Sequence, residues 1–159
     1  MGVFQKLKVI FFGPSPLIKL MLKEHGAINL LLNDLKKDLR SEIASENFRK
    51  LQEKVSQHMH GEEKAIFIMY KKNKISKVVT TLLKQHTALL DLADSVESRI
   101  KSKKNFSKEL KEFEQAHAAH IELEERDFYY KMDSVLDEYE KEKIVKAYNT
   151  YILGSIHLA

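Results

Sequence analysis

Four histidines and two glutamates recur along this chain in a pattern that can bind metal ions. His58 is followed by Glu62, and His120 is followed by Glu124, at the same spacing of four residues. Residues four apart share one face of an α-helix, about 6 Å apart along its axis, so each pair can present two donor atoms in one direction. Imidazole nitrogen together with carboxylate oxygen suits iron, manganese or zinc.

Each pair also has a lone histidine upstream at nearly the same distance. His25 precedes His58 by 33 residues, and His86 precedes His120 by 34. Two helices joined by a short connection and running antiparallel would return the second histidine to the depth of the first. Two ionised carboxylates in one apolar layer are costly, and metal cations remove that cost. The repeat therefore predicts a two-metal site whose ligands are His25, His58, Glu62, His86, His120 and Glu124.

Other polar residues near the repeat are predicted to lie outside the ligand set. Glu63 and Glu125 follow the predicted ligands, about 100° further round the helix, and are expected to face solvent. His60 lies two residues after His58 and is expected on the opposite side of the helix. His117 is expected at the surface or beside the ligands rather than bound to metal. The aromatic residues that follow the ligand pairs are expected in the bundle core: Phe67, Tyr70, Phe128, Tyr129 and Tyr130.

Alternative chemistries lack their motifs. A ferritin-like di-metal site uses two Glu-x-x-His motifs, and here only Glu114 with His117 matches. The H-E-x-x-H zinc motif, the glycine-rich phosphate loop and the G-x-S-x-G motif do not occur. The chain has no cysteine, which excludes thiolate ligands and cysteine nucleophiles. A metal-free helical interaction module is the alternative from a different class.

The elements that must position these residues are predicted to be helical. Both prolines lie before residue 17, and good helix formers such as Leu, Lys, Glu and Ala dominate the rest. The chain is therefore expected to be all-α: an up-down-up-down antiparallel four-helix bundle with a short C-terminal fifth helix. We expect these five helices over about residues 15–40, 45–72, 76–101, 108–132 and 133–153.

Local patterns place the starts and the buried faces of these helices. Ser15 before Pro16 is a capping residue followed by a first-turn proline. Ser45 is expected near the start of the second helix, and Asp133 with Ser134 at the start of the fifth. The first helix is predicted to bury a stripe with helical periodicity: Ile18, Leu22, Ile28, Leu32 and Leu35.

The length of 159 residues fits a single domain. We divide it into an N-terminal arm (1–16), the bundle (17–132) and a C-terminal helix with its tail (133–159). The arm has an apolar run and is expected to pack either on the bundle or on a second subunit of a homodimer.

Charge and composition narrow the expected partners and compartment. The net charge of +4 comes from 27 basic and 23 acidic residues that are well mixed, so no nucleic-acid partner is expected. No stretch approaches the roughly 18–20 apolar residues of a membrane-spanning helix, so no membrane partner is expected either. A chain without cysteine fits the reducing cytoplasm, and we expect a cytoplasmic protein.

With these residues in hand, the chain resembles the hemerythrin-like, or HHE cation-binding, family. The matching residues are His25, His58 with Glu62 and Glu63, His86, and His120 with Glu124 and Glu125. The resemblance implies a di-iron centre with an oxo or hydroxo bridge, in which Glu62 and Glu124 bridge the irons. It further implies that His25 and His120 bind one iron and that His58 and His86 bind the other.

The sequence departs from the classical oxygen carriers of that family at two positions. Leu82 stands where those proteins have a fifth histidine, and Glu125 stands where they have an aspartate. With four histidines and two glutamates, the site looks closer to the iron-sensing and iron-cluster repair branches. We expect a non-haem di-iron protein that binds or senses oxygen or nitric oxide, or handles iron. The alternative is a di-iron enzyme in nitric oxide or peroxide detoxification or in iron–sulfur cluster repair.

Overall fold

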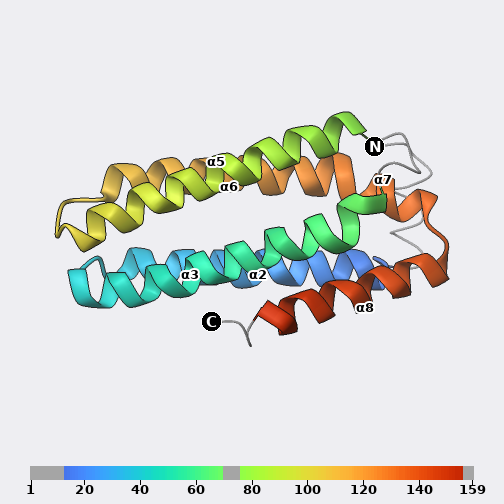
Figure 1. The fold of residues 1–159 in the computed structure, drawn as a ribbon, viewed down its shortest axis with the longest axis horizontal. Coiled ribbons are helices and arrows are strands. Elements are labelled where there is room, and N and C mark those ends of the chain that lie inside the picture. Colours follow the sequence, from blue (N-terminus) through green and yellow to red (C-terminus); the bar gives the residue numbers. More distant parts are fainter. Residues whose placement is uncertain (1–12, 70–75, 156–159) are drawn as a thin grey trace.

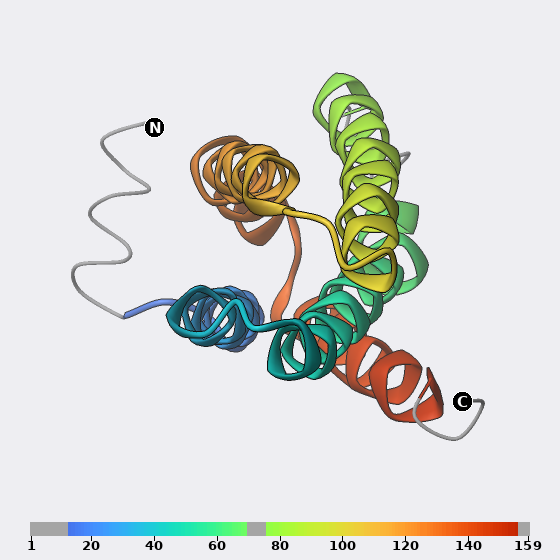
Figure 2. The same ribbon diagram turned by 90° about the vertical axis from the view of Figure 1, so that its left-hand side faces the viewer.

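Four long α-helices run side by side along the length of the molecule (Figure 1). A further helix, α8 (Glu138–Ser155), packs against α2 and α3 on the outside of the other helices (Figure 2). This computed structural model describes residues 13–69 and 76–155, and within those ranges it contains no strand, which confirms the all-α prediction. The long helices are α2 (Pro16–Lys37), α3 (Ser41–Gly61), α5 (Ser76–Lys101) and α6 (Ser107–Leu123).

Both short connections between neighbouring long helices lie at one end of the molecule, on the left in Figure 1. Residues 38–40 join α2 to α3, and residues 102–106 join α5 to α6. The bundle is thus assembled from two helical hairpins. None of the described helices is both long enough and apolar enough to cross a membrane. The arm prediction falls mainly on residues 1–12, outside the described residues, as does Tyr70.

The helix starts agree with the sequence at α2 and α5, lie within one residue of it at α6, and differ at α3 and α8. Ser15 caps α2 by accepting a hydrogen bond from the backbone N–H of Ile18 at 3.3 Å, and Pro16 is the first helical residue, as predicted. The second helix begins at Ser41, before the predicted Ser45.

The predicted start of the fifth helix is wrong, because Asp133 and Ser134 lie inside α7 (Tyr129–Val135). The chain breaks instead at Leu136, and Asp137 with Glu140 forms a reciprocal capping box at the start of α8. The Asp137 carboxylate accepts from the Glu140 N–H at 2.8 Å, and the Glu140 carboxylate accepts from the Asp137 N–H at 3.2 Å.

Two π-helical turns interrupt the predicted second and fourth helices, and each begins at a predicted metal ligand. The first, η1, spans Glu62–Ile66, and the second, η3, spans Glu124–Phe128. In each, the residue after the turn donates its N–H to the carbonyl of the glutamate five residues earlier. A π-turn accommodates one extra residue and re-aims the side chains around it, and such turns occur frequently at functional sites. A 3-10 turn, η2 (Phe67–Met69), follows η1, and α7 follows η3.

The apolar core forms two clusters, separated along the helices by the polar repeat. One contains Ile28, Val55 and Phe113, and the other contains Met21 and Phe128. On α2, for example, His25 lies between Met21 of one cluster and Ile28 of the other. The predicted stripe of α2 is buried except at Leu22, which is 39% exposed, because Met21 takes the inward position.

Candidate metal centre

The structure brings all six predicted ligand residues into one buried layer. Each long helix contributes one histidine, and the two glutamates begin the two π-turns. All six are at most 2% exposed: His25, His58, Glu62, His86, His120 and Glu124. A layer of six titratable side chains inside an apolar core is costly unless a ligand satisfies it.

The donor atoms fall into two groups that share Glu124. One group contains His86, His120, Glu62 and Glu124, and the other contains His25, His58 and Glu124; within each group the donor atoms lie within 4.8 Å of one another. The ring centroids are 5.0 Å apart for His25 and His58 and 4.9 Å apart for His86 and His120.

This grouping of donor atoms differs from the histidine pairing that the family resemblance implies. The resemblance places His25 with His120 and His58 with His86, whereas the structure groups His25 with His58 and His86 with His120. The physical reason is the hairpin itself, because the two helices of each hairpin are packed neighbours and carry their histidines at similar depth.

Glu124 presents one oxygen to each group of histidines. Its Oε2 lies 3.2 Å from His25 Nε2, and its Oε1 lies 3.2 Å from His120 Nε2. Glu62 is arranged differently, with Oε2 at 3.3 Å from His86 Nε2 and 3.7 Å from His58 Nε2. A carboxylate with its two oxygens turned to two donor groups is suited to bridge two cations.

The atoms that face the centre of this layer have no hydrogen-bond partner among the described residues. They are Nε2 of His58, His86 and His120, Oε2 of Glu62 and both carboxylate oxygens of Glu124. Buried polar atoms are nearly always satisfied in native proteins. A convergent set of unpaired nitrogen and oxygen donors is what a transition-metal cation needs, and the residues therefore fit such an ion.

The opposite nitrogen of each histidine ring is held by a polar partner. Metal-binding histidines use such a contact to fix the tautomer and the orientation of the ring. The partners of the Nδ1 atoms are Glu125 Oε1 for His25 (2.8 Å), Tyr148 Oη for His58 (2.7 Å), Glu63 Oε1 for His86 (2.7 Å) and Gln85 Oε1 for His120 (3.1 Å).

Glu63 and Glu125 thus contact the predicted ligands, and the prediction that they simply face solvent is wrong. Each side chain is 38% exposed and uses one oxygen to hold a histidine of the other hairpin. The repeated Glu-Glu dipeptide was the available sequence signal, because both copies keep the second glutamate. Helical phasing missed the contact because it assumed regular α-helix through a π-turn.

The electrostatics differ among the histidines of the layer. For His86, burial acts downward on the pKa, but contacts with Glu62 and Glu63 outweigh it and raise the pKa. Burial lowers the pKa of His58 and of His120 to about 3, so both rings keep a free lone pair for a cation. Burial, together with the nearby Glu62, raises the pKa of Glu124 well above its ordinary value. For Glu62, burial acts upward too, but contacts with His58 and His86 outweigh it and lower the pKa. The two carboxyl groups are therefore unequal before any cation binds.

Tyr129 belongs to the centre, although the sequence placed it only in the core. It is 1% exposed, as a core residue should be. Its hydroxyl donates to Glu62 Oε1 and lies 3.5 Å from His25 Nε2. Burial raises its pKa well above 10, which keeps the hydroxyl protonated as a donor. Phe67 and Phe128 are buried as predicted, whereas Tyr130 is only partly buried.

The two other candidate histidines lie outside the donor groups. His60 is exposed, as predicted. His117 is 2% exposed and stacks on Phe113, with ring centroids 6.1 Å apart and an interplanar angle of 4°. Burial lowers the pKa of His117 to about 4, consistent with a neutral ring beside the ligands.

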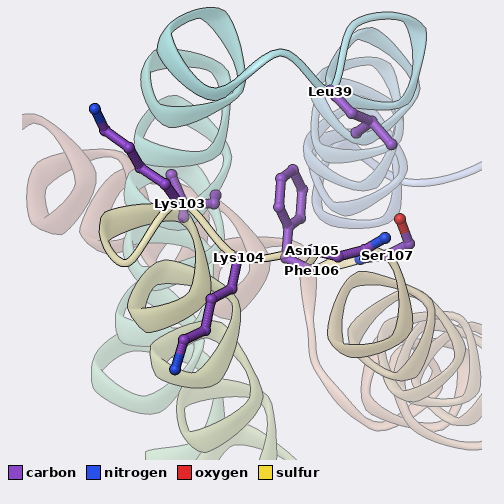
Figure 3. Close-up of a pocket in the computed structure, with 7 residues that line it drawn as sticks. Leu39, Lys103, Lys104, Asn105, Phe106 and Ser107 are labelled. Carbon is purple, nitrogen blue, oxygen red and sulfur yellow. Dashed lines mark hydrogen bonds between the residues drawn. The ribbon is translucent and has the colours of Figure 1, made fainter.

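A cavity of about 250 Å³ at the connection between α5 and α6 is separate from this centre (Figure 3). No histidine or carboxylate lines it, so it does not extend the metal site. Its lining residues are Leu39, Ile100, Lys103, Lys104, Asn105, Phe106 and Ser107.

The comparison with protein families agrees with this geometry. The hemerythrin HHE cation binding domain matches residues 17–132, which contain all six donor residues. The chain therefore belongs to the hemerythrin HHE cation-binding domain family. Comparisons with curated proteins and with solved structures find no match.

Proposed function

We propose that this protein is a non-haem di-iron protein that binds or senses oxygen or nitric oxide, or handles iron. The observation that carries the proposal is the pair of donor groups with unpaired, convergent nitrogen and oxygen atoms that share Glu124. In this proposal His25 and His58 hold one ion, and His86 and His120 hold the other. Glu62 and Glu124 would supply carboxylate oxygens to this proposed oxo- or hydroxo-bridged di-iron centre.

The scaffold is proposed to be a single domain with an up-down-up-down antiparallel bundle. The short connections at residues 38–40 and 102–106 support this order, because helices joined in this way must turn back on their neighbours. A chain without cysteine suits the reducing cytoplasm as its compartment.

Bound iron would supply a redox-active Lewis acid that can coordinate a small diatomic molecule. The chain's own residues set the conditions around it. Phe67 and Phe128 are buried at 3% and 0% exposure and form an edge-to-face pair, with Phe67 stacked on His86, so this side of the layer is closed to water. Leu82 is fully buried in the same apolar cluster. It supplies no fifth imidazole, which favours sensing or iron handling over reversible oxygen carriage.

A second candidate function is a di-iron enzyme that turns over nitric oxide or peroxide, or that donates iron for cluster repair. The observation that favours turnover is the Tyr129 hydroxyl, which donates to Glu62 and lies 3.5 Å from His25 Nε2. A hydroxyl that stays protonated at this place can donate a hydrogen bond to a ligand as it is reduced.

Anaerobic loading with Fe(II), followed by iron quantitation and an optical spectrum, tests both candidates. We expect about two irons per chain, and oxygen exposure should produce the absorption of a bridged diferric centre. If the protein retains no iron after loading, both proposed functions are contradicted and the metal-free interaction module is favoured. Catalytic consumption of nitric oxide or peroxide by the loaded protein would select the enzyme over the sensor.

A further inference from the structure

Helix α8 reaches into the metal centre through one side chain, Tyr148. This helix lies beyond residues 17–132, the part of the chain that the family match covers. Tyr148 is 0% exposed. Its hydroxyl lies 2.7 Å from His58 Nδ1 and 3.4 Å from Glu24 Oε2. A helix outside the ligand-bearing bundle thus supplies the polar partner of a predicted ligand.

Gly61 makes the close approach of this ring possible. A Cβ atom added at Gly61 would lie 2.6 Å from Cε2 and 2.9 Å from Cδ2 of Tyr148, far inside a normal contact. The glycine is the last residue of α3 and directly precedes Glu62, where the first π-turn begins. The aromatic ring therefore packs against the backbone between His58 and Glu62.

The hydrogen bonds beyond Tyr148 give its hydroxyl a fixed direction. Glu24 is only 7% exposed, and its Oε2 lies 2.6 Å from Lys54 Nζ. Because Glu24 accepts from the Tyr148 hydroxyl, the phenol oxygen is left to accept from His58 Nδ1–H. The protonated Nδ1 leaves the lone pair of His58 on Nε2, which is the atom that faces Glu62.

In the second hairpin, the polar partner of the equivalent histidine comes from inside the bundle. His120 Nδ1 lies 3.1 Å from Gln85 Oε1, and Gln85 is carried by α5, next to the histidine His86. No described element outside the two hairpins is involved in that contact. The two metal positions therefore differ in what holds their ligands.

We propose that Tyr148 is a positioning residue of the metal centre, through which α8 orients His58 and tunes the metal position formed by His25 and His58. The proposal rests on the proposed function, because it requires that the centre binds metal. Since Tyr148 stabilises the tautomer that binds the cation, bound metal in turn stabilises the docked position of α8.

The test compares Tyr148→Phe with Tyr139→Phe by anaerobic calorimetric titration of the full chain with Fe(II). Tyr148→Phe keeps the ring and removes only the hydroxyl, while Tyr139 is on the same helix and 73% exposed. Loss of an outer partner of a metal-binding histidine typically weakens affinity about 10–100-fold. We expect a loss of this size for one of the two ions in Tyr148→Phe and unchanged binding in Tyr139→Phe.

Hydrogen exchange of α8 and the variant Gly61→Ala supply independent readouts. Fe(II) loading should slow amide exchange in α8 of the wild-type protein, and this protection should shrink in Tyr148→Phe. Gly61→Ala should reproduce the selective loss, because its methyl group displaces the Tyr148 ring.

Tyr148→Phe that binds both ions as tightly as wild type, or that weakens both equally, would overturn the inference while leaving the proposed function intact. Wild-type protein that binds no Fe(II) would overturn both.

Discussion

The first hairpin, α2 with α3, and the second, α5 with α6, each supply two histidines and one glutamate that starts a π-turn. Each also sends a second glutamate across to the other hairpin, where Glu63 holds His86 and Glu125 holds His25. In all of these respects the two halves repeat one another. The repeat therefore sets the positions of the donor atoms and of half of their polar partners.

The halves differ where residues outside the repeat reach the centre. Tyr129 donates to Glu62 and Tyr148 contacts His58, both in the first hairpin. In the absence of metal, the pKa of Glu62 is lowered and that of Glu124 is raised. Against the effect of burial, contacts with histidines lower the first, whereas burial and the nearby Glu62 raise the second, so two carboxyl groups at equivalent places differ in pKa. The comparison teaches that the repeat builds the site, while two tyrosines give the first hairpin polar contacts that the described residues of the second lack.

The largest effect is expected from removing both glutamates that the repeat shares. Glu62→Ala together with Glu124→Ala deletes the carboxylates that lie between the two histidine groups, so dinuclear loading should be abolished. Iron quantitation after anaerobic loading measures this, with circular dichroism to confirm that the helices persist. A double variant that still holds two irons would mean that the ligands lie elsewhere.

Single glutamate changes should separate the two sides. Glu124 belongs to both donor groups, whereas Glu62 belongs to one. Glu124→Gln should therefore lower the affinity for both ions. Glu62→Gln should mainly lower the affinity for the ion held by His86 and His120. Each loss should exceed the roughly 10–100-fold typical of an outer partner. Stepwise Fe(II) titration measures both affinities, and equal effects of the two variants would remove the inequality that we infer for the carboxylates.

Most of the site could be predicted from the sequence because ligands on regular helices obey a spacing rule. The lone histidines His25 and His86 have no motif of their own. Each precedes a His-Glu pair at nearly the same distance, and all four histidines lie in the layer. The phasing rule failed after Glu62 and Glu124, because a π-turn changes the azimuth of the residues that follow. It also missed Tyr148, which lies 90 residues from its partner His58 and has no counterpart in the repeat.

The fold, too, could be predicted where local sequence decides it, and the prediction failed where a tertiary contact decides. The all-helical class and the Ser15 cap follow from local chemistry, and the structure contains both. The start of α8 was placed at Asp133 because Asp-Ser is a common capping sequence. In the structure the Asp133 carboxylate accepts from Ser15 and lies 3.6 Å from Lys141 Nζ. A tertiary contact thus claimed the side chain that local reasoning had assigned to a cap.

Moderate and equal effects are expected where the two halves repeat. Glu63→Gln and Glu125→Gln each replace a carboxylate that holds one histidine with a neutral amide. Each variant should lower the affinity for one ion by about 10-fold. This is the lower end of the range for such partners, because an amide oxygen can still accept the hydrogen bond from the histidine. Glu122→Gln is the control, because Glu122 is exposed and pairs with Arg126 rather than with a histidine. Clearly unequal losses for the two variants would break the symmetry that we assign to these contacts.

A smaller effect is expected from loosening α8 at its start, far from the ligands. Asp137→Ala removes the side-chain acceptor of the capping box and should destabilise the protein by about 1 kcal/mol. For a chain of this size that corresponds to a fall in melting temperature of about 2–4 °C. Iron stoichiometry should not change, because Tyr148 lies three turns further along the helix. Loss of iron in this variant would show that the cap, and not Tyr148, controls the site.

The smallest effect is expected at His60, two residues from a predicted ligand. His58 is 2% exposed and points into the layer, whereas His60 is exposed and meets the ring of Tyr151 edge-on, with centroids 6.1 Å apart. His60→Ala should leave both affinities for Fe(II) unchanged. His58→Ala should lower the affinity for the ion that His58 and His25 hold together. Because both residues lie within one turn of the same helix, the pair separates direct ligation from a general effect of losing an imidazole. Loss of iron in His60→Ala would mean that the other face of α3 binds the metal. The comparison between the two hairpins would then be wrong.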